Sequence, residues 1–360
     1  MKPSRRKTRS LTLLALFLLP TLLAAEEEWT RLELSLHESG VLYGASSELE
    51  DPGPGEVGRY GPEQLFDFHP YTAWSEGVPG DGVGEAIYLS LEPGATALGM
   101  RNGFARSDRL FEANNRPRFL RVTPIGALNL QGFATEYFTV YDGKPLAPSA
   151  RLPLEDRRTP QRVELPYDWT RLEEAMARLL ASDEVAEMRF PQAREMGVGP
   201  EAPIPMSYRY VLKIEIAGIY EGSRWSDCCI ADLWPDYGPV EAVEVSDDGA
   251  GLLAFTEAGY EIEVYRDEQS VLEVSAVSPE SEWATVVASP REAGRGRVYT
   301  EHRLISAATG KELTQTLIGE PAPLLLGFEP GDGAPRVLVG EPEETRAVRC
   351  ELYPFNEAPR

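Results

Sequence analysis

The chain has 360 residues, of which 42% are hydrophobic, so it can bury a sizeable core, and its length favours two domains over one. Its 58 acidic residues outnumber 35 Lys and Arg and give a formal net charge of −23, a surface that repels nucleic acid and anionic lipid. Acidic residues scattered among arginines are also typical of an ordinary solvated surface.

The first 25 residues have the pattern of a secretory signal peptide. Five Lys and Arg within residues 2–9 precede an apolar run from Leu11 to Leu19, and the small residues Ala24 and Ala25 follow. A membrane anchor is the alternative, but this segment is shorter than the roughly 20 residues that a membrane span needs, and no Cys follows it to carry a lipid. The sequence therefore predicts a secreted or periplasmic chain starting near Glu26, without stable membrane insertion, and with a formal charge of about −28.

Short strand-like segments dominate the next 200 residues. They are rich in Val, Ile, Tyr and Phe and are separated by turn-forming residues, which predicts an all-β antiparallel sandwich. Asp142-Gly143 is a pair typical of hairpin turns, so we expect a turn there. The segments are TRLELSLHESGVLYGASS (30–47), EAIYLSL (85–91), RFLRVTPI (118–125), EYFTVYDGKPL (136–146), QRVELPY (161–167) and RYVLKIEIAGIY (209–220).

One helix interrupts the strands. Leu172, Met176, Leu179 and Leu180 recur at helical spacing, and Asp168 stands in front of them as an N-cap residue. An apolar stripe of this kind is the usual way in which a helix docks on a sheet. We therefore expect a surface helix packed against the sandwich.

A second strand-rich region follows the Pro and Gly cluster at 235–239. Its strands are short and closely spaced, and the turn at 307–313 resembles turns in propeller blades. About 115 residues are too few for a full propeller. We predict a small β-sandwich or barrel over residues 240–360.

Three cysteines allow at most one disulfide. Cys228 and Cys229 are adjacent and Cys350 is distant, so Cys350 could pair with either neighbour. A strained vicinal bridge or no bridge at all remains open. The three cysteines and three histidines lack the paired spacing of zinc ligands.

Most enzyme motifs are absent from the sequence. The glycine run Gly80–Glu85 precedes a strand, whereas a phosphate-binding loop follows a strand and leads into a helix. Asp67, Glu76, Asp81 and Glu85 lie within nineteen residues and could supply the carboxylate pair of a glycoside hydrolase. In a chain with so many acids, turn formation and solvent exposure explain them better, so we predict a chain that is not an enzyme.

Three blocks of sequence resemble a known family. LFDFHPYTAW (65–74) resembles the first loop of discoidin-like domains, the galactose-binding-like sandwich of coagulation factor C domains. The blocks at 72–89, 101–122 and 212–233 resemble, in order, the NADase-type glycan-binding branch, also called the NAD-glycohydrolase translocation domain. The resemblance spans residues 60–233.

The resemblance implies a jelly-roll-like β-sandwich over residues 29–239, with the helix as an insertion and loops at one end that hold a carbohydrate. An indole can stack on a sugar ring, and amide or guanidinium groups donate to hydroxyls. For Trp74 and Asn102 a role in the loop scaffold is favoured, and for Arg106 and Arg116 a role in ligand contact. The implied ligand-binding residues are Trp74, Glu76, Asn102, Arg106, Asn114, Asn115 and Arg116.

The resemblance also raises the question of structural calcium, with no other cofactor implied. Related domains hold the ion through oxygen ligands at positions that correspond to Asp67, Thr72 and Asp232. Phe68 and His69 replace the usual Gly-Asp and remove one oxygen ligand, and Asp232 is shorter than the Glu of relatives. These departures put the calcium site in doubt.

The resulting functional hypothesis is an exported, non-catalytic module that recognises a carbohydrate or glycoprotein. An envelope scaffold that docks a protein partner is the alternative, and a glycoside hydrolase is a distant third. The sequence predicts no binding of nucleic acid, and it does not specify which glycan is bound.

Overall fold

The computed structural model describes residues 28–37, 40–50, 59–69, 71–130, 138–188, 206–291, 300–314, 318, 324–330, 334–340 and 345–350. The predicted signal peptide at 1–25 lies outside these residues. Strands far outnumber helices, which confirms the all-β prediction. No helix in the described ranges is both long and apolar enough to cross a membrane.

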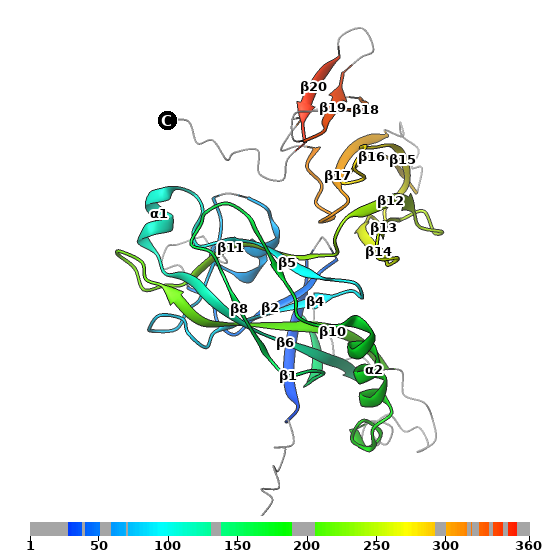
Figure 1. Ribbon diagram of the computed structural model, residues 1–360. Coiled ribbons are helices and arrows are strands. Elements are labelled where there is room, and N and C mark those ends of the chain that lie inside the picture. The colour runs from blue at the N-terminus through cyan, green and yellow to red at the C-terminus, as the bar shows by residue number, and fades with distance from the viewer. Residues whose placement is uncertain are drawn as a thin grey trace, which may run out of the picture.

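A seven-stranded antiparallel sheet forms the larger layer of the first region (Figure 1). Its order is β10-β4-β2-β1-β7-β6-β8, and β10 pairs with β6 as well as with β4, so the sheet closes on itself. The strands are β1 (Thr30–Leu36), β2 (Leu42–Ala45), β4 (Ala86–Leu91), β6 (Arg116–Leu130), β7 (Thr139–Pro145), β8 (Ala150–Pro153) and β10 (Met206–Tyr220).

A four-stranded sheet of order β3-β11-β5-β9 packs against the first sheet. The two sheets share the main apolar core, in which Leu98, Leu120 and Leu212 are completely buried. Two short helical elements connect strands at this side: the 3₁₀ helix η1 (Pro62–Phe66) and α1 (Asp108–Ala113). The strands are β3 (Trp74–Ser75), β5 (Ala97–Asn102), β9 (Gln161–Glu164) and β11 (Cys229–Asp236).

The turn predicted at Asp142-Gly143 is wrong. Both residues lie within β7, where Asp142 pairs with Arg31 and Gly143 with Thr30 of β1. A β-carbon on Gly143 would lie 2.8 Å from Cγ2 of Ile125, so tight packing explains the glycine.

The predicted helix is confirmed as α2 (Trp169–Leu180). The side chain of Asp168 accepts a hydrogen bond from the backbone N–H of Arg171 as the N-cap. Leu172 and Met176 are buried against the sandwich, as the apolar stripe predicts.

The second region consists of three antiparallel three-stranded sheets. The first two sheets share one apolar cluster, and the third packs on residues of β16 and β17. The glycine-containing turn predicted after β17 is present, with Gly310 at φ 71°. The strands are β12 (Val240–Val245), β13 (Gly251–Thr256), β14 (Glu261–Arg266), β15 (Ser270–Val277), β16 (Trp283–Pro290), β17 (Glu301–Ser306), β18 (Leu325–Glu329), β19 (Arg336–Val339) and β20 (Arg346–Arg349).

Two tyrosines join the regions. Tyr260 lies against Gly94, because a β-carbon added to Gly94 would be 2.5 Å from the Cγ atom of Tyr260. The hydroxyl of Tyr237 accepts a hydrogen bond of 3.2 Å from the backbone N–H of Glu92. Both tyrosines contact the apolar clusters of both regions, so the second region sits directly on the sandwich.

Candidate functional site

The three sequence blocks meet at one end of the sandwich, around the start of β11. Trp74 and Ser75 of the first block pair with Ile230 and Cys229 of the third. From the second block, Gly103 and Asn115 form isolated bridges to Ile230 and Cys228. We call the loops 76–85, 103–115 and 221–228 the rim.

Trp74 lies inside the core rather than on the rim surface. Its side chain is fully buried in the apolar cluster between the sheets, and its Nε1 donates a 3.0 Å hydrogen bond to the carbonyl of Ser47. A buried indole with a satisfied N–H has no face left for a sugar. The scaffold role favoured for Trp74 therefore fits the structure.

Glu76 fastens the first block to the third. Its Oε1 accepts the backbone N–H of Cys228 at 3.2 Å, its Oε2 accepts that of Val78 at 2.8 Å, and the side chain is 1% exposed. Burial raises the pKa of Glu76, while the two backbone hydrogen bonds oppose the shift. The carboxylate satisfies loop backbone instead of facing solvent.

The three candidate asparagines also bond to backbone. Nδ2 of Asn102 donates to Pro117 at 2.8 Å, and Nδ2 of Asn114 donates to Leu110 at the end of α1, also at 2.8 Å. Asn115 donates to Ser226 at 2.6 Å and accepts from the N–H of Gly222 at 2.7 Å. All three are buried, and the amide of Asn115 connects the second and third loops of the rim.

Arg116 forms an internal ion pair with Asp156. Its Nε and Nη2 contact the two carboxylate oxygens of Asp156 at 2.5 and 2.6 Å. The guanidinium lies 4.6 Å from the ring centroid of Phe111, and the residue is 8% exposed. The expected ligand role of Arg116 is not supported, because its donors are already engaged inside the protein.

Arg106 alone among the seven candidate ligand-binding residues is exposed. Its guanidinium lies 5.4 Å from the centroid of the Tyr71 ring, and His69 packs edge-on against the same tyrosine at 5.2 Å. We define the aromatic-arginine patch as His69, Tyr71 and Arg106. A second group of contacts consists of Arg59 over Tyr60 and of Tyr60 against Phe104, which packs on the buried cluster of Ala73 and Ala105.

Sequence reasoning missed the aromatic members of this patch. Tyr71 is 42% exposed and lies in the first loop, 65–74, between the candidate residues Asp67 and Trp74. No local signal separates the exposed Tyr71 from the buried Trp74, because residues from other parts of the chain decide which of them is covered. Asp156, the partner of Arg116, had no sequence signal because forty residues separate the two.

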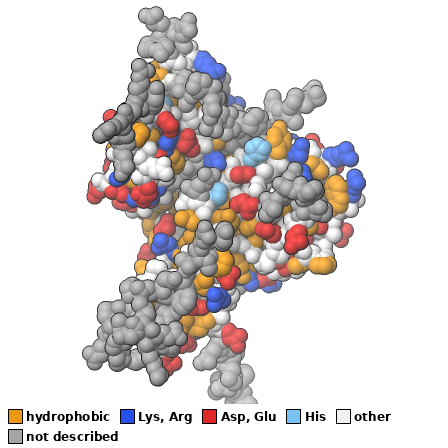
Figure 2. All heavy atoms as spheres, turned by 180° about the vertical axis from the view of Figure 1, so that it is seen from behind, with side chains coloured by type: hydrophobic (Ala, Val, Ile, Leu, Met, Phe, Trp, Pro, Cys, Tyr) orange, Lys and Arg blue, Asp and Glu red, His pale blue; other side chains and the backbone are white. Residues whose placement is uncertain are grey.

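Side chains of both charges occur on the surface of the sandwich. Figure 2 shows several Lys and Arg side chains together at the right-hand end of the sandwich, whereas Asp and Glu are spread over this face. Arg106, Arg109 and Arg224 of the rim are exposed, and so are Asp81, Asp108, Glu112 and Glu221. The rim therefore offers cationic donors beside acidic groups.

The residues proposed for calcium do not fit the ion. Oδ1 of Asp67 already accepts the N–H of His69 at 2.8 Å and the hydroxyl of Thr72 at 3.0 Å. Burial raises the pKa of Asp67, although these hydrogen bonds oppose the shift. Asp232 is fully buried in β11 opposite Arg101, and the described residues hold no group of three or more acids, His or Cys placed for a metal. Calcium needs six to eight oxygen ligands, which these residues do not assemble.

The three cysteines are free thiols, so the expected disulfide between Cys350 and Cys228 or Cys229 is not formed. Cys350 packs in the core of the third small sheet, whereas Cys228 belongs to the core of the sandwich. Burial raises the pKa of Cys229 and of Cys350 to about 12 and that of Cys228 well above its ordinary value. Of the alternatives open from the sequence, the one without a bridge is found.

Comparison with known proteins finds a family match within the first region. The family described as the NAD glycohydrolase translocation F5/8 type C domain matches residues 41–129, which include the first two blocks. The third block, at 212–233, lies outside the match but pairs with the other two in the fold. No curated protein sequence matches the chain.

Among solved structures, two cryo-EM classes of a mutant of the arabinofuranosyltransferase AftD from Mycobacteria are similar to this chain. They have TM-scores of 0.30 and 0.28, with 11% and 10% identity over 75% and 76% of this chain. The aligned part is 15% of either structure's chain, and a likeness this weak carries no argument about fold or function. Residues 41–129 of this chain therefore match a discoidin-like domain of the NAD glycohydrolase translocation type, and the rest of the chain lies outside the match.

Proposed function

We propose that this chain is an exported, non-catalytic module that binds a carbohydrate or a glycosylated surface through the aromatic-arginine patch. The observation that carries the proposal is the exposed pair of Tyr71 and Arg106 at the end where the three family blocks meet. Export rests on the signal-peptide pattern of residues 1–25.

The chemistry of the patch suits a sugar. The apolar face of a pyranose or furanose ring can stack on Tyr71, and the guanidinium of Arg106 can donate to ring hydroxyls in fixed geometry. Both side chains are exposed while the loops beneath them are held by buried hydrogen bonds. A preorganised surface of this kind loses little conformational entropy on binding.

The four acids between residues 67 and 85 support a role without catalysis. Each carboxylate is used in the structure of a loop. Asp67 and Glu76 accept the bonds given above, Asp81 accepts the N–H of Val83 at 3.1 Å, and Glu85 accepts the hydroxyls of Ser46 and Ser47 at 2.5 and 2.6 Å. A hydrolase needs two carboxyl groups that face its substrate.

A glycan array probed with the full chain tests the proposal, followed by calorimetric titration of the sugars that bind. We expect Tyr71→Ala and Arg106→Ala each to weaken binding at least tenfold with unchanged thermal stability. Tyr208→Ala is the matched control, because this tyrosine is 43% exposed on β10, outside the rim. Absence of binding across the array would refute carbohydrate recognition.

An envelope scaffold that binds a protein partner is the second candidate. Its support is the exposure of Leu36, Val271, Leu324 and Leu326, which are large apolar side chains outside the rim. Pull-down from the envelope fraction before and after glycosidase treatment separates the two functions. Partners retained after the treatment would favour the scaffold.

A further inference from the structure

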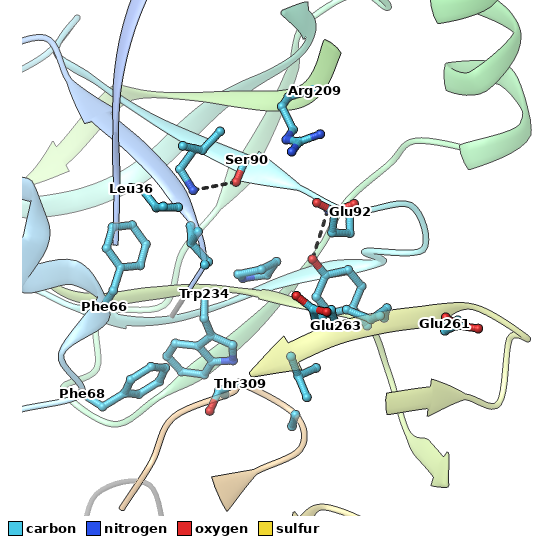
Figure 3. A pocket seen from close by; sticks show the side chains of 18 of the residues that line it. Leu36, Phe66, Phe68, Ser90, Glu92, Arg209, Trp234, Glu261, Glu263 and Thr309 are labelled. Atoms are coloured by element: carbon cyan, nitrogen blue, oxygen red, sulfur yellow. Dashed lines mark hydrogen bonds between the residues drawn. The ribbon is translucent and has the colours of Figure 1, made fainter. Parts of the chain in front are cut away.

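A cavity of about 590 Å³ lies between the sandwich and the second region. We call it the interdomain cleft (Figure 3). Strand β11 and the loop after η1 line one side of the cleft, and β14 and the turn at Ala308 and Thr309 line another. Arg209 of β10 and Glu92, the residue after β4, also border it. Its volume lies within the range of about 300–1,000 Å³ typical of small-molecule sites.

Aromatic side chains form the sandwich wall of the cleft. The indole of Trp234 lies flat on β5, because a β-carbon on Gly99 would be 1.9 Å from its Cε2 atom. Phe68 contacts Trp234 with ring centroids 5.3 Å apart, and Phe66 lines the same side.

Phe68 holds its position at a conformational cost. Its φ is 52°, in the left-handed region that bulky residues rarely adopt. Strain of this kind persists where the surroundings fix it and is common at ligand sites. Here it keeps a third aromatic ring at the cleft beside Trp234.

Charged groups of both signs border the same cavity. Glu92 and Arg209 lie on the sandwich side, and β14 contributes Glu261 and Glu263, of which Glu263 pairs with Arg266. Within the described residues, the carboxylate of Glu92 has no ion pair or hydrogen bond. Burial raises the pKa of Glu92, and the charge of Arg209 opposes this shift. Among the residues that the structure describes, the guanidinium of Arg209 donates to the carbonyl of its neighbour Tyr208, at 3.2 Å, and to no other group. Figure 3 shows the side chains of Glu92 and Arg209 across the cavity from Phe68.

We infer that the interdomain cleft is a binding site for a neutral carbohydrate, separate from the aromatic-arginine patch. A sugar hydroxyl can donate to Glu92 and accept from Arg209, while the sugar ring packs against Trp234, which the buried Phe68 supports. An anionic ligand would meet the carboxylates of Glu92, Glu261 and Glu263, so a neutral sugar is favoured over an acidic one. The inference rests on the proposed function, since it extends carbohydrate binding to a second surface.

Titration of the full chain with the trisaccharides raffinose, maltotriose and mannotriose tests the inference, followed by calorimetry and by tryptophan fluorescence. We expect at least one of them to bind, and Glu92→Gln and Arg209→Ala each to weaken that binding at least tenfold. Both substitutions spare the backbone N–H of Glu92 that bonds to Tyr237. Trp234→Phe should remove most of the fluorescence change and retain a folded protein.

Matched controls are Glu244→Gln on β12 and Arg171→Ala on α2, both exposed residues outside the cleft, which should bind as the parent does. Failure of all three trisaccharides to bind, or binding that survives both cleft substitutions, overturns the inference. The proposed function then still stands if array binding is lost in Tyr71→Ala. Loss of all binding, on the array and in titration, overturns both.

Discussion

At the scale of single residues, the polar side chains of the rim serve the backbone. A loop without regular pairing leaves N–H and C=O groups that must find partners when buried. Glu76, Asn102 and Asn115 supply these partners across 15 to 152 residues of sequence. Residue types that suggest sugar binding in a sequence are the same types that satisfy buried loops.

We expect Arg116→Ala to lower the free energy of unfolding by about 1.5–3 kcal/mol, as loss of hydrogen bonds to a charged partner usually does. The cause is the bidentate contact with Asp156, which the variant removes. Urea denaturation measures the change. Arg118→Ala, an exposed neighbour, should cost less than about 1 kcal/mol. Equal stability of Arg116→Ala and the parent would show that the ion pair contributes nothing.

Asp267 should make stability depend on pH. Burial would raise its pKa, but hydrogen bonds, foremost from Arg303 at 2.7 Å, hold it below the ordinary value of 3.8. A carboxyl with a lowered folded pKa contributes stability above its unfolded pKa and loses it as the pH falls through the folded value. We therefore expect Asp267→Asn to destabilise the protein by about 1–3 kcal/mol at pH 7 and by much less near pH 2.

Urea titrations at the two pH values measure this difference. Glu301→Gln provides the control, because Glu301 contacts the same arginine but its side chain is 65% exposed. Its removal should change stability by less than about 1 kcal/mol. A destabilisation by Asp267→Asn that is equal at both pH values would contradict the assigned ion pair.

At the scale of elements, strand ends explain why three distant blocks share one rim. β5 ends at Asn102, β6 begins at Arg116, β10 ends at Tyr220 and β11 begins at Cys229, so their connecting loops emerge at the same end of the sandwich. Antiparallel pairing of β6 with β10 and of β5 with β11 fixes this arrangement. The loops can approach closely only where small residues permit it.

Gly222 is such a residue. A β-carbon there would lie 2.4 Å from the carbonyl carbon of Asn114 and 2.6 Å from the carbonyl oxygen of Ala113, both backbone atoms. We expect Gly222→Ala to destabilise the protein by about 1–3 kcal/mol, measured by thermal unfolding, because the loop must move away from α1. Gly218→Ala on β10 is the control, since its nearest contact is a side-chain carbon of Phe119 at 3.2 Å. Similar losses in both variants would rule out the backbone contact as the cause.

At the scale of the whole molecule, two tyrosines contribute to the contact between the second region and the sandwich beside the interdomain cleft. Tyr237 and Tyr260 each pack against both apolar clusters. Aromatic residues at the centre of a contact often carry much of its energy, so loss of one of them should weaken the attachment.

We expect Tyr260→Ala to loosen this attachment without unfolding either region. The measurable results are a larger radius of gyration in X-ray scattering and a thermal transition that splits in two. Tyr208→Ala, at an exposed position on β10, should leave both measurements unchanged. An unaltered scattering profile for Tyr260→Ala would mean that other contacts suffice to dock the region.

The sequence by itself determined the elements whose signals are local. The apolar stripe from Leu172 to Leu180 and the cap at Asp168 predict α2 because helix periodicity and capping depend on neighbouring residues. The same holds for the β-rich pattern and for the three family blocks. Strand β5 was missed, since Ala97–Asn102 contains glycine and arginine and lacks the β-branched residues typical of strands.

Only the tertiary structure decided which polar residues face solvent. Trp74 and Tyr71 are three residues apart, yet one is fully buried and the other 42% exposed. Arg116 is internal because Asp156 lies beside it. Gly143 lies in a strand because it pairs with Thr30 of β1, and Ile125 leaves no space there for a β-carbon. Burial and pairing depend on residues brought together from distant parts of the chain, and a local pattern contains no record of them.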